Sequence, residues 1–215
     1  MFPTMISSII LGLSIAAPIG PINIEIVKRG LLYGFWPAFL VGLGGMSSDL
    51  LLMAAMFFGL SQVLTMVWVK ITLMGLGCFI LIHSGWVNLF ASVVPNEAKE
   101  SVHRQSVQVR RRSYITGLTI AGTNPMNLLF WISIYGSVLS SSFQQDNQLQ
   151  AFLTSSLVFV GIGLWNLNLA LTVHFSRILM NQAVMRSICI IASLVLIGFG
   201  IYFGYQCAVL VFQII

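Results

Sequence analysis

The stretch Ala16–Asn23, with the sequence AAPIGPIN, interrupts an apolar run near the N-terminus. Its two prolines enclose a glycine, and proline both removes a backbone donor and clashes with the helical turn before it. An unbroken helix is therefore excluded. In hydrocarbon, the backbone groups freed by such a break must be satisfied inside the protein or beside a water-filled cavity. The stretch predicts a broken membrane-spanning helix.

A second stretch of this kind is Gly122–Asn127, with the sequence GTNPMN. Both stretches carry the pattern Pro-x-Asn, at Pro21/Asn23 and at Pro125/Asn127. Paired helix breaks at corresponding places in two halves of a chain indicate a transporter binding site. The positive ends of half-helices suit a carboxylate, and free carbonyls suit an ammonium group or a cation. The alternative is that both breaks are simple kinks.

The composition places most of the chain in lipid. The 215 residues are 58% hydrophobic and 7% charged, with a mean hydropathy of +0.96. A soluble domain of this size could not bury so much apolar surface. The net charge of +5 is interpreted as the positive-inside bias of membrane proteins, and no nucleic-acid partner is predicted. The three cysteines lack metal or redox spacing, so we expect no metal site and no cofactor.

Six membrane spans are predicted from the uncharged runs, at about 3–24, 34–60, 63–90, 113–139, 151–175 and 187–215. Each is long enough to cross the hydrocarbon core, which takes about 20 residues. The predicted fold is an all-α polytopic membrane protein. It divides into a first three-helix repeat (1–92), a basic cytoplasmic loop (93–112) and a second three-helix repeat (113–215).

The basic residues predict the orientation of these spans. All but one of the 10 Lys and Arg residues fall in the loops after spans one, three and five, and Lys70 alone lies on the other side. By the positive-inside rule, both termini lie outside and the 93–112 loop lies in the cytoplasm. Because each half has an odd number of spans, the second repeat must be inverted relative to the first.

Asp49 is the strongest single candidate for function. It lies roughly 22 Å into the second span at 1.5 Å per residue, within the hydrocarbon zone. A carboxylate there costs at least about 2.5 kcal/mol, and such residues generally mark functional sites. Because desolvation favours the neutral acid, Asp49 suits proton coupling or the binding of a substrate amine. The alternative is a structural pair with another helix, for which His83 is a candidate partner.

Two other polar positions have both structural and functional interpretations. Glu25 precedes Lys28 and Arg29 by about one helical turn, which favours a structural ion pair near the cytoplasmic interface. In the fifth span, Asn166 or Asn168 occupies a place that corresponds to Asp49, so one of them faces the same cavity or bonds a neighbouring helix. Small-residue spacings indicate tight helix packing and leave a homo-oligomer open.

The chain resembles the LysE-type translocator family of lysine and homoserine/threonine exporters. The resemblance rests on the first break, the glycine-rich segment after it, Asp49 and the Asn124-Pro125 pair. The resemblance covers nearly the whole chain. It implies an exporter of amino acids or related small metabolites in the bacterial inner membrane, driven by a proton or ion gradient. The first break reads Pro-Ile-Gly-Pro, and Met126 stands where a lysine often follows the proline in the family. Lysine and threonine are therefore not carried over as substrates.

The predicted function is a secondary active exporter that works by alternating access, with H⁺ as coupling ion, and not an enzyme. Asp49 is the predicted proton-coupling residue. The alternatives are a membrane thiol-disulfide electron conduit, which needs a cysteine pair at the breaks, and a non-transport structural or assembly protein. The predicted substrate site comprises Pro18, Gly20, Pro21, Asn23, Asp49, Asn124, Pro125, Asn127 and Asn166.

Overall fold

The structure is a computed structural model that describes residues 2–18, 20–57, 66–89, 102–124, 127–128, 131 and 148–212. Within these ranges the regular structure is entirely helical, which confirms the predicted all-α class. The helices are α1 (Phe2–Ala16), α2 (Pro21–Tyr33), α3 (Phe35–Phe57), α5 (Val67–Leu89), α6 (Val102–Thr123), α9 (Gln148–Leu179) and α10 (Gln182–Phe212).

Helices end at both predicted breaks. At the first, α1 ends at Ala16 and α2 begins at Pro21, with a bend of 75° between them. Gly20 precedes α2 in an extended conformation, and Pro21 occupies the first helical turn, where its missing N–H costs no hydrogen bond. At the second, α6 ends at Thr123. Pro125 lies outside the described residues.

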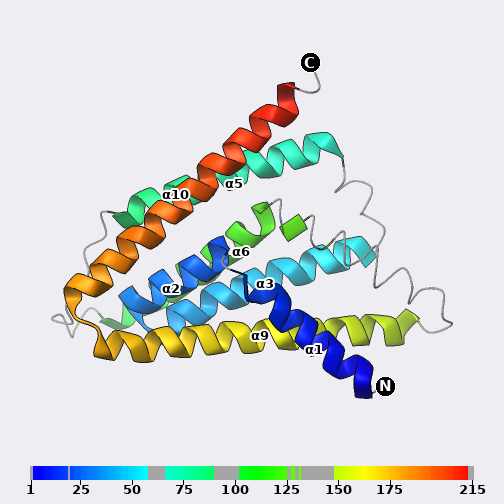
Figure 1. Cartoon of the computed structure of the whole chain (residues 1–215), viewed down its shortest axis with the longest axis horizontal. Helices are drawn as coiled ribbons and strands as arrows, with labels where there is room; N and C mark the ends of the chain where they lie inside the picture. The colour runs from blue at the N-terminus through cyan, green and yellow to red at the C-terminus, as the bar shows by residue number, and fades with distance from the viewer. Residues whose placement is uncertain are drawn as a thin grey trace.

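Helices distant in sequence pack side by side in pairs, α3 with α6, α1 with α9, and α5 with α10 (Figure 1). The short α2 contacts α3, α9 and α10, and so lies between the α5–α10 pair and the rest of the molecule. A cluster of buried apolar side chains from α2, α5, α6 and α10 fills this junction. The broken helix α1–α2 is therefore anchored on both sides of its bend.

Glycines bring two of these pairs into close contact. A Cβ atom at Gly12 of α1 would lie 2.0 Å from the carbonyl oxygen of Val158 in α9. A Cβ atom at Gly44 of α3 would lie 2.1 Å from the carbonyl oxygen of Tyr114 in α6. Since real side chains do not fit at such distances, these helix backbones touch only because the side chain is absent.

Large apolar side chains cover the outside of the molecule. Trp68, Phe79 and Leu179 are 70%, 69% and 88% exposed, respectively. In the described ranges, 4 helices are long and apolar enough to span a membrane, and the bent pair α1–α2 makes a fifth if it is one span. The chain is a multi-pass membrane protein. The predicted fourth span continues beyond α6 into residues that the structure mostly does not describe.

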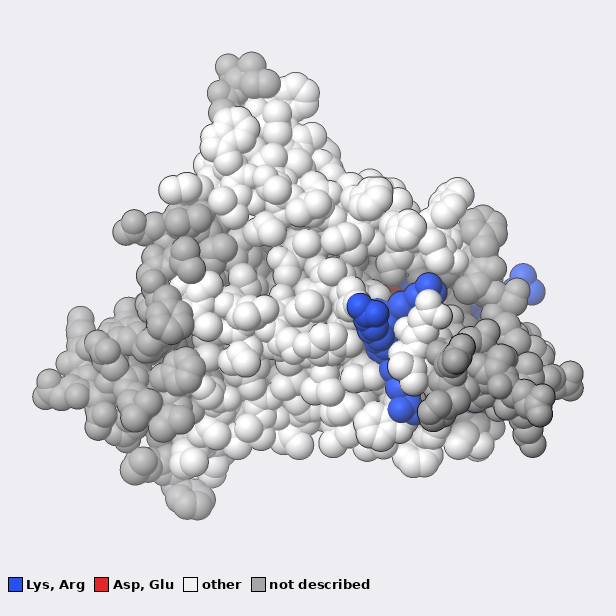
Figure 2. All heavy atoms as spheres, turned by 180° about the vertical axis from the view of Figure 1, so that it is seen from behind, with Lys and Arg blue, Asp and Glu red and all other residues white. Residues whose placement is uncertain are grey.

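The helices extend further than the uncharged runs predicted, because basic residues expected in loops lie in helices. The segment 93–112 is helical from Val102 onward, α9 includes Arg177, and Arg186 lies in α10. These residues are thus helical where loops were predicted, because long basic side chains can reach out from a helix while their stems cover apolar surface. Exposed Arg110 does so, with its guanidinium 5.6 Å from the centre of the Trp36 ring. Lys and Arg side chains gather toward one end of the face in Figure 2.

Candidate functional site

A cavity of about 150 Å³ lies where the two helix breaks meet α3 and α9. Every predicted site residue that the structure describes lines it, namely Pro18, Gly20, Pro21, Asn23, Asp49, Asn124, Asn127 and Asn166. The remainder of the lining is mostly apolar, with Ile15, Met46 and Ile162 among its members. The fold thus brings together side chains that are more than a hundred residues apart.

The first break is stabilised by the side chain of Asn23. Its Nδ2 donates to the carbonyl oxygens of Ala16 and Pro18, both at 2.8 Å. These bonds satisfy acceptors that the end of α1 leaves free. On the other side of the break, Gly20 has no side chain with which to cap α2. The first amides of α2, those of Ile22 and Asn23, therefore have no acceptor within their own helix, and both residues line the cavity.

The second break has a matching bond. Asn127 Nδ2 donates to the carbonyl oxygen of Ala121 in the last turn of α6 at 3.2 Å. It also donates to Oδ1 of Asp49 at 2.5 Å. Asn127 therefore connects the second break directly to the acidic residue of α3.

Asp49 is held by neutral donors. Its Oδ1 also accepts a hydrogen bond from Nε1 of Trp131 at 3.1 Å. Trp131 is buried and stacks on Phe159 of α9, with the ring centres 5.3 Å apart. In the part of the chain that the structure describes, no Lys, Arg or His forms an ion pair with Asp49. The carboxylate thus faces the cavity without a compensating positive charge.

From the sequence, His83 is a candidate partner of Asp49, although a lone histidine is more often hydrogen-bonded packing. The structure places His83 elsewhere, exposed on α5, where its ring stacks on Phe79. Besides Asn127, the observed partner is Trp131, which was not predicted. Its indole N–H was the available signal, because a buried tryptophan usually needs a hydrogen-bond acceptor.

The two asparagines of α9 differ in their surroundings. Asn166 is 3% exposed and lines the cavity, whereas Asn168 is exposed on the outside of the helix. A Cβ atom at Gly42 of α3 would lie 2.8 Å from both Cβ and Cγ of Asn166. Gly42 therefore makes room for this amide. Its position in the glycine-rich segment did not predict this role.

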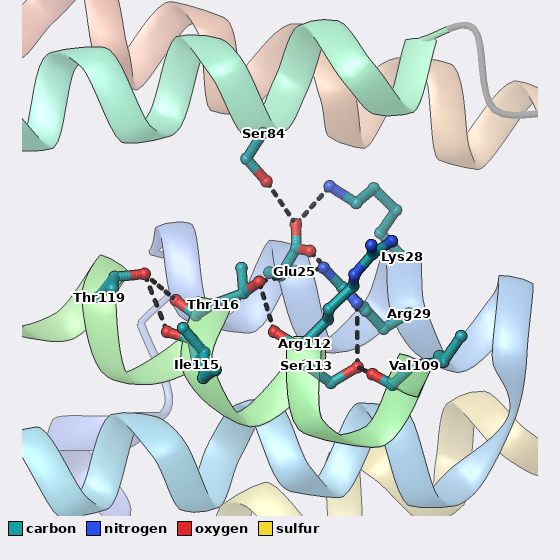
Figure 3. A network of polar contacts seen from close by, with 10 residues as sticks. All are labelled: Glu25, Lys28, Arg29, Ser84, Val109, Arg112, Ser113, Ile115, Thr116 and Thr119. Carbon is teal, nitrogen blue, oxygen red and sulfur yellow. Dashed lines mark hydrogen bonds and ion pairs between the residues drawn. The ribbon is translucent and has the colours of Figure 1, made fainter. Parts of the chain in front are cut away.

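A second polar cluster lies outside the cavity lining and centres on Glu25 (Figure 3). Glu25 forms ion pairs with Lys28 and with Arg29, the latter at 2.8 Å. This confirms the predicted pairing. The ion pair is also buried within the protein, since Glu25 and Lys28 are 0% and 1% exposed. Their mutual pairing allows this burial.

The same cluster joins three helices. From α2, Arg29 donates to Ser113 Oγ at 3.0 Å and to Thr116 Oγ1 at 3.1 Å, both in α6. From α5, Ser84 donates to Glu25 Oε2 at 3.4 Å. These contacts thus fix α2 against α5 and α6. We call the residues that make them the Glu25 cluster: Glu25, Lys28, Arg29, Ser84, Ser113 and Thr116.

The cavity is not a metal or thiol site as far as the structure describes it. The described residues contain no group of three or more His, Cys, Asp or Glu side chains that could hold a metal ion. Cys78, Cys189 and Cys207 are free, and none of them lines the cavity. What the cavity offers is one carboxylate, several amides and the start of a helix.

A multi-pass helical protein with a polar cavity between two helix breaks has the architecture of a membrane translocator. A profile of the LysE type translocator family matches residues 13–207. The "Putative amino acid efflux protein YcgF" of Bacillus subtilis (strain 168) is 38% identical over 201 residues, which cover 94% of this chain and 95% of that protein. The chain belongs to the LysE type translocator family and is not an enzyme. No solved structure matches it.

Proposed function

We propose that the protein is a secondary exporter of amino acids or related small metabolites across the bacterial inner membrane, and that the substrate binds in the cavity between the helix breaks. The observation that carries this proposal is the convergence of both breaks, Asp49 and Asn166 on one cavity. The name of the Bacillus subtilis relative supports an amino acid as substrate. The cavity of about 150 Å³ is smaller than the roughly 300–1,000 Å³ of drug-sized ligand sites, which supports a small solute.

The two halves of the chain form inverted repeats in this proposal. Support comes from two reciprocal helix contacts, in which α1 packs on α9 as α6 packs on α3. Gly12 and Gly161 make close contacts in the first pair, and Gly117 and Gly44 make the equivalent contacts in the second. Each glycine would clash with the partner's backbone if it carried a Cβ atom.

The cavity residues follow the same correspondence. Asp49 comes as many residues after Gly44 as Asn166 comes after Gly161. Asn23 and Asn127 each donate to a carbonyl oxygen at the end of the preceding helix. Alternating access then consists of one repeat rocking against the other around the shared cavity.

Coupling to the proton gradient occurs at Asp49. A proton and the ammonium group of an amino acid compete for the same carboxylate, because a neutral acid no longer attracts a cation. A substrate that binds from one side of the membrane is displaced by a proton that enters from the other side. The cycle therefore exchanges H⁺ for substrate. Both termini lie outside, and the exposed arginines of α6 face the cytoplasm and its anionic lipids.

The alternatives have less support. An electron conduit needs reactive cysteines at the breaks, and none of the three cysteines lines the cavity. A purely structural role leaves the uncompensated Asp49 without an explanation.

The test is efflux from proteoliposomes preloaded with a mixture of labelled amino acids, with and without a pH gradient. We expect gradient-driven efflux by the wild type and a loss of at least about a hundredfold in Asp49→Asn, whose amide can neither be protonated nor bind an ammonium group as a carboxylate does. Full gradient-driven efflux by Asp49→Asn would contradict the coupling role. If correctly inserted wild type releases no amino acid, the proposal that amino acids are the substrates is wrong, and related small metabolites are tested next.

A further inference from the structure

The polar groups of the cavity are spread along its length. On α3, Gly42 and Asp49 are about two helical turns apart, roughly 10 Å at 1.5 Å per residue. Asn166 packs against Gly42, and the side chain of Ile22 packs against Gly45. Asp49 and Asn166 therefore lie toward opposite ends of the cavity, and the start of α2 lies between them.

Asn166 has hydrogen-bonding capacity that the protein does not use. Its side chain offers two donors and one acceptor. It is 3% exposed, yet among the described residues nothing hydrogen-bonds to its amide. The amide lies in the lining of the cavity, and its oxygen and nitrogen are not among the fully buried atoms without a partner, so they are accessible from the cavity. This observation points to a polar ligand group at the Asn166 end.

We propose that Asn166 recognises the side chain of the substrate and makes the protein selective for amino acids with short, neutral, polar side chains, those that end in a hydroxyl or an amide. This inference rests on the proposed export function. The α-ammonium group binds at Asp49, and the α-carboxylate binds at the amides of Ile22 and Asn23, which have no acceptor within their own helix. The ammonium and carboxylate of an amino acid are adjacent, so its side chain extends from them toward Asn166.

The rest of the lining excludes other side chains. Asp49 is the only charged side chain among the described residues that line the cavity. A lysine or arginine side chain would therefore place a second positive charge against an amide and apolar groups such as Ile162, and burying an unpaired charge is expensive. An acidic side chain meets no cation there. A purely apolar side chain fits but leaves the Asn166 amide unpaired.

The experiment measures the ratio of substrates exchanged by the protein in proteoliposomes, in counterflow competition between serine, asparagine, alanine and lysine. We expect the wild type to prefer serine and asparagine over alanine, and to exchange lysine poorly. In Asn166→Leu, which has a similar size but no polar group, the preference for serine over alanine falls by at least about tenfold. In Asn166→Asp, the ratio of lysine to serine rises by at least about tenfold, because the second carboxylate pairs with the side-chain ammonium.

Asn168→Leu is the matched control, since Asn168 lies on the same helix but outside the cavity, and its ratios should equal those of the wild type. A ratio between two substrates on one sample does not depend on how much of the protein is folded. If wild type exchanges amino acids and both Asn166 variants keep its ratios, this inference is wrong and the export function stands. If wild type exchanges no amino acid, this inference is wrong, and so is the proposal that amino acids are the substrates.

Discussion

Glu25 and Asp49 are both acidic residues within apolar helices, but they have opposite surroundings. Glu25 is fully buried, paired with two cations of its own helix, and bonded to a serine of α5. Among the described residues, Asp49 receives only the neutral donors of Asn127 and Trp131, and it faces the cavity. The first acid is compensated by charge within the protein, and the second, in our proposal, is compensated by a proton or substrate that enters the cavity.

The comparison shows that depth in the membrane does not by itself identify a functional acid. An intramembrane carboxylate costs free energy wherever it lies. A structural carboxylate recovers that cost from fixed partners, as Glu25 does, and it holds α2 against α5 and α6. A transport carboxylate must exchange partners, so its fixed bonds are to neutral groups that tolerate both the charged and the protonated form.

The largest effect on stability is expected for Glu25→Ala. This variant leaves the buried Lys28 and the partly buried Arg29 without their anion, and breaking a buried pair in this way costs about 3–5 kcal/mol. Thermal unfolding of the purified protein in detergent should show a strongly lowered midpoint. The double variant Glu25→Ala/Lys28→Met removes one uncompensated charge and should recover part of the loss.

An unchanged unfolding midpoint in Glu25→Ala would contradict the structural role of the Glu25 cluster. Asp49→Asn provides the contrast, because the amide oxygen can still accept from Asn127 and Trp131. We expect its midpoint to stay close to that of the wild type while its gradient-driven efflux is lost.

A smaller effect on stability is expected from weakening the contact between α3 and α6. This contact supports both the cavity and the Glu25 cluster. This contact sets Asp49 beside Asn127 and places Ser113 and Thr116 beside Arg29. In Gly44→Ala the new methyl group would lie 2.1 Å from the backbone oxygen of Tyr114. Separating the helices to accommodate it should cost about 1–3 kcal/mol.

Gly75→Ala is the control for Gly44→Ala, because a Cβ atom there meets nothing within 4 Å. The midpoint of Gly44→Ala should fall relative to this control, and its efflux should fall as well. A variant that loses efflux at an unchanged midpoint would show that the contact affects only the cavity.

The helix breaks were predictable because proline and glycine act locally. Pro18, Pro21 and Asn124-Pro125 mark the breaks whatever surrounds them, and composition alone predicts a helical membrane protein. The members of the cavity were predictable because polar residues in apolar helices are few and generally face protein. Which of Asn166 and Asn168 lines the cavity was not predictable, because this depends on the rotation of α9 in the packed bundle.

The remaining differences also have tertiary causes. From the sequence, Arg29 is predicted to lie in a loop. Its contacts with Glu25, Ser113 and Thr116 exist only in the folded protein. The Trp131 indole and the space above Gly42 acquire their roles only when segments far apart in sequence come into contact. The predicted helix ends were misplaced for the same reason. A charged residue does not end a helix if its charge is paired inside the fold, as at Glu25, or if its side chain reaches outward, as at Arg110.

The finest comparison is between Asn23 and Asn127, whose side chains each donate across a helix break. Replacing either by alanine removes bonds to backbone carbonyls, and side-chain bonds within membranes contribute about 1 kcal/mol. Similar, small decreases in the unfolding midpoint are therefore expected for Asn23→Ala and Asn127→Ala. Their effects on transport should differ, because only Asn127 also donates to Asp49.

Loss of this bond in Asn127→Ala removes a donor that favours the charged carboxylate. Gradient-driven efflux should then fall several-fold more in Asn127→Ala than in Asn23→Ala, because only Asn127→Ala takes a donor from Asp49. Efflux measured for both variants at equal amounts of inserted protein checks this. Equal efflux would mean that Asn127 serves only the break, as Asn23 does, and that the link between the second break and Asp49 is not used in transport.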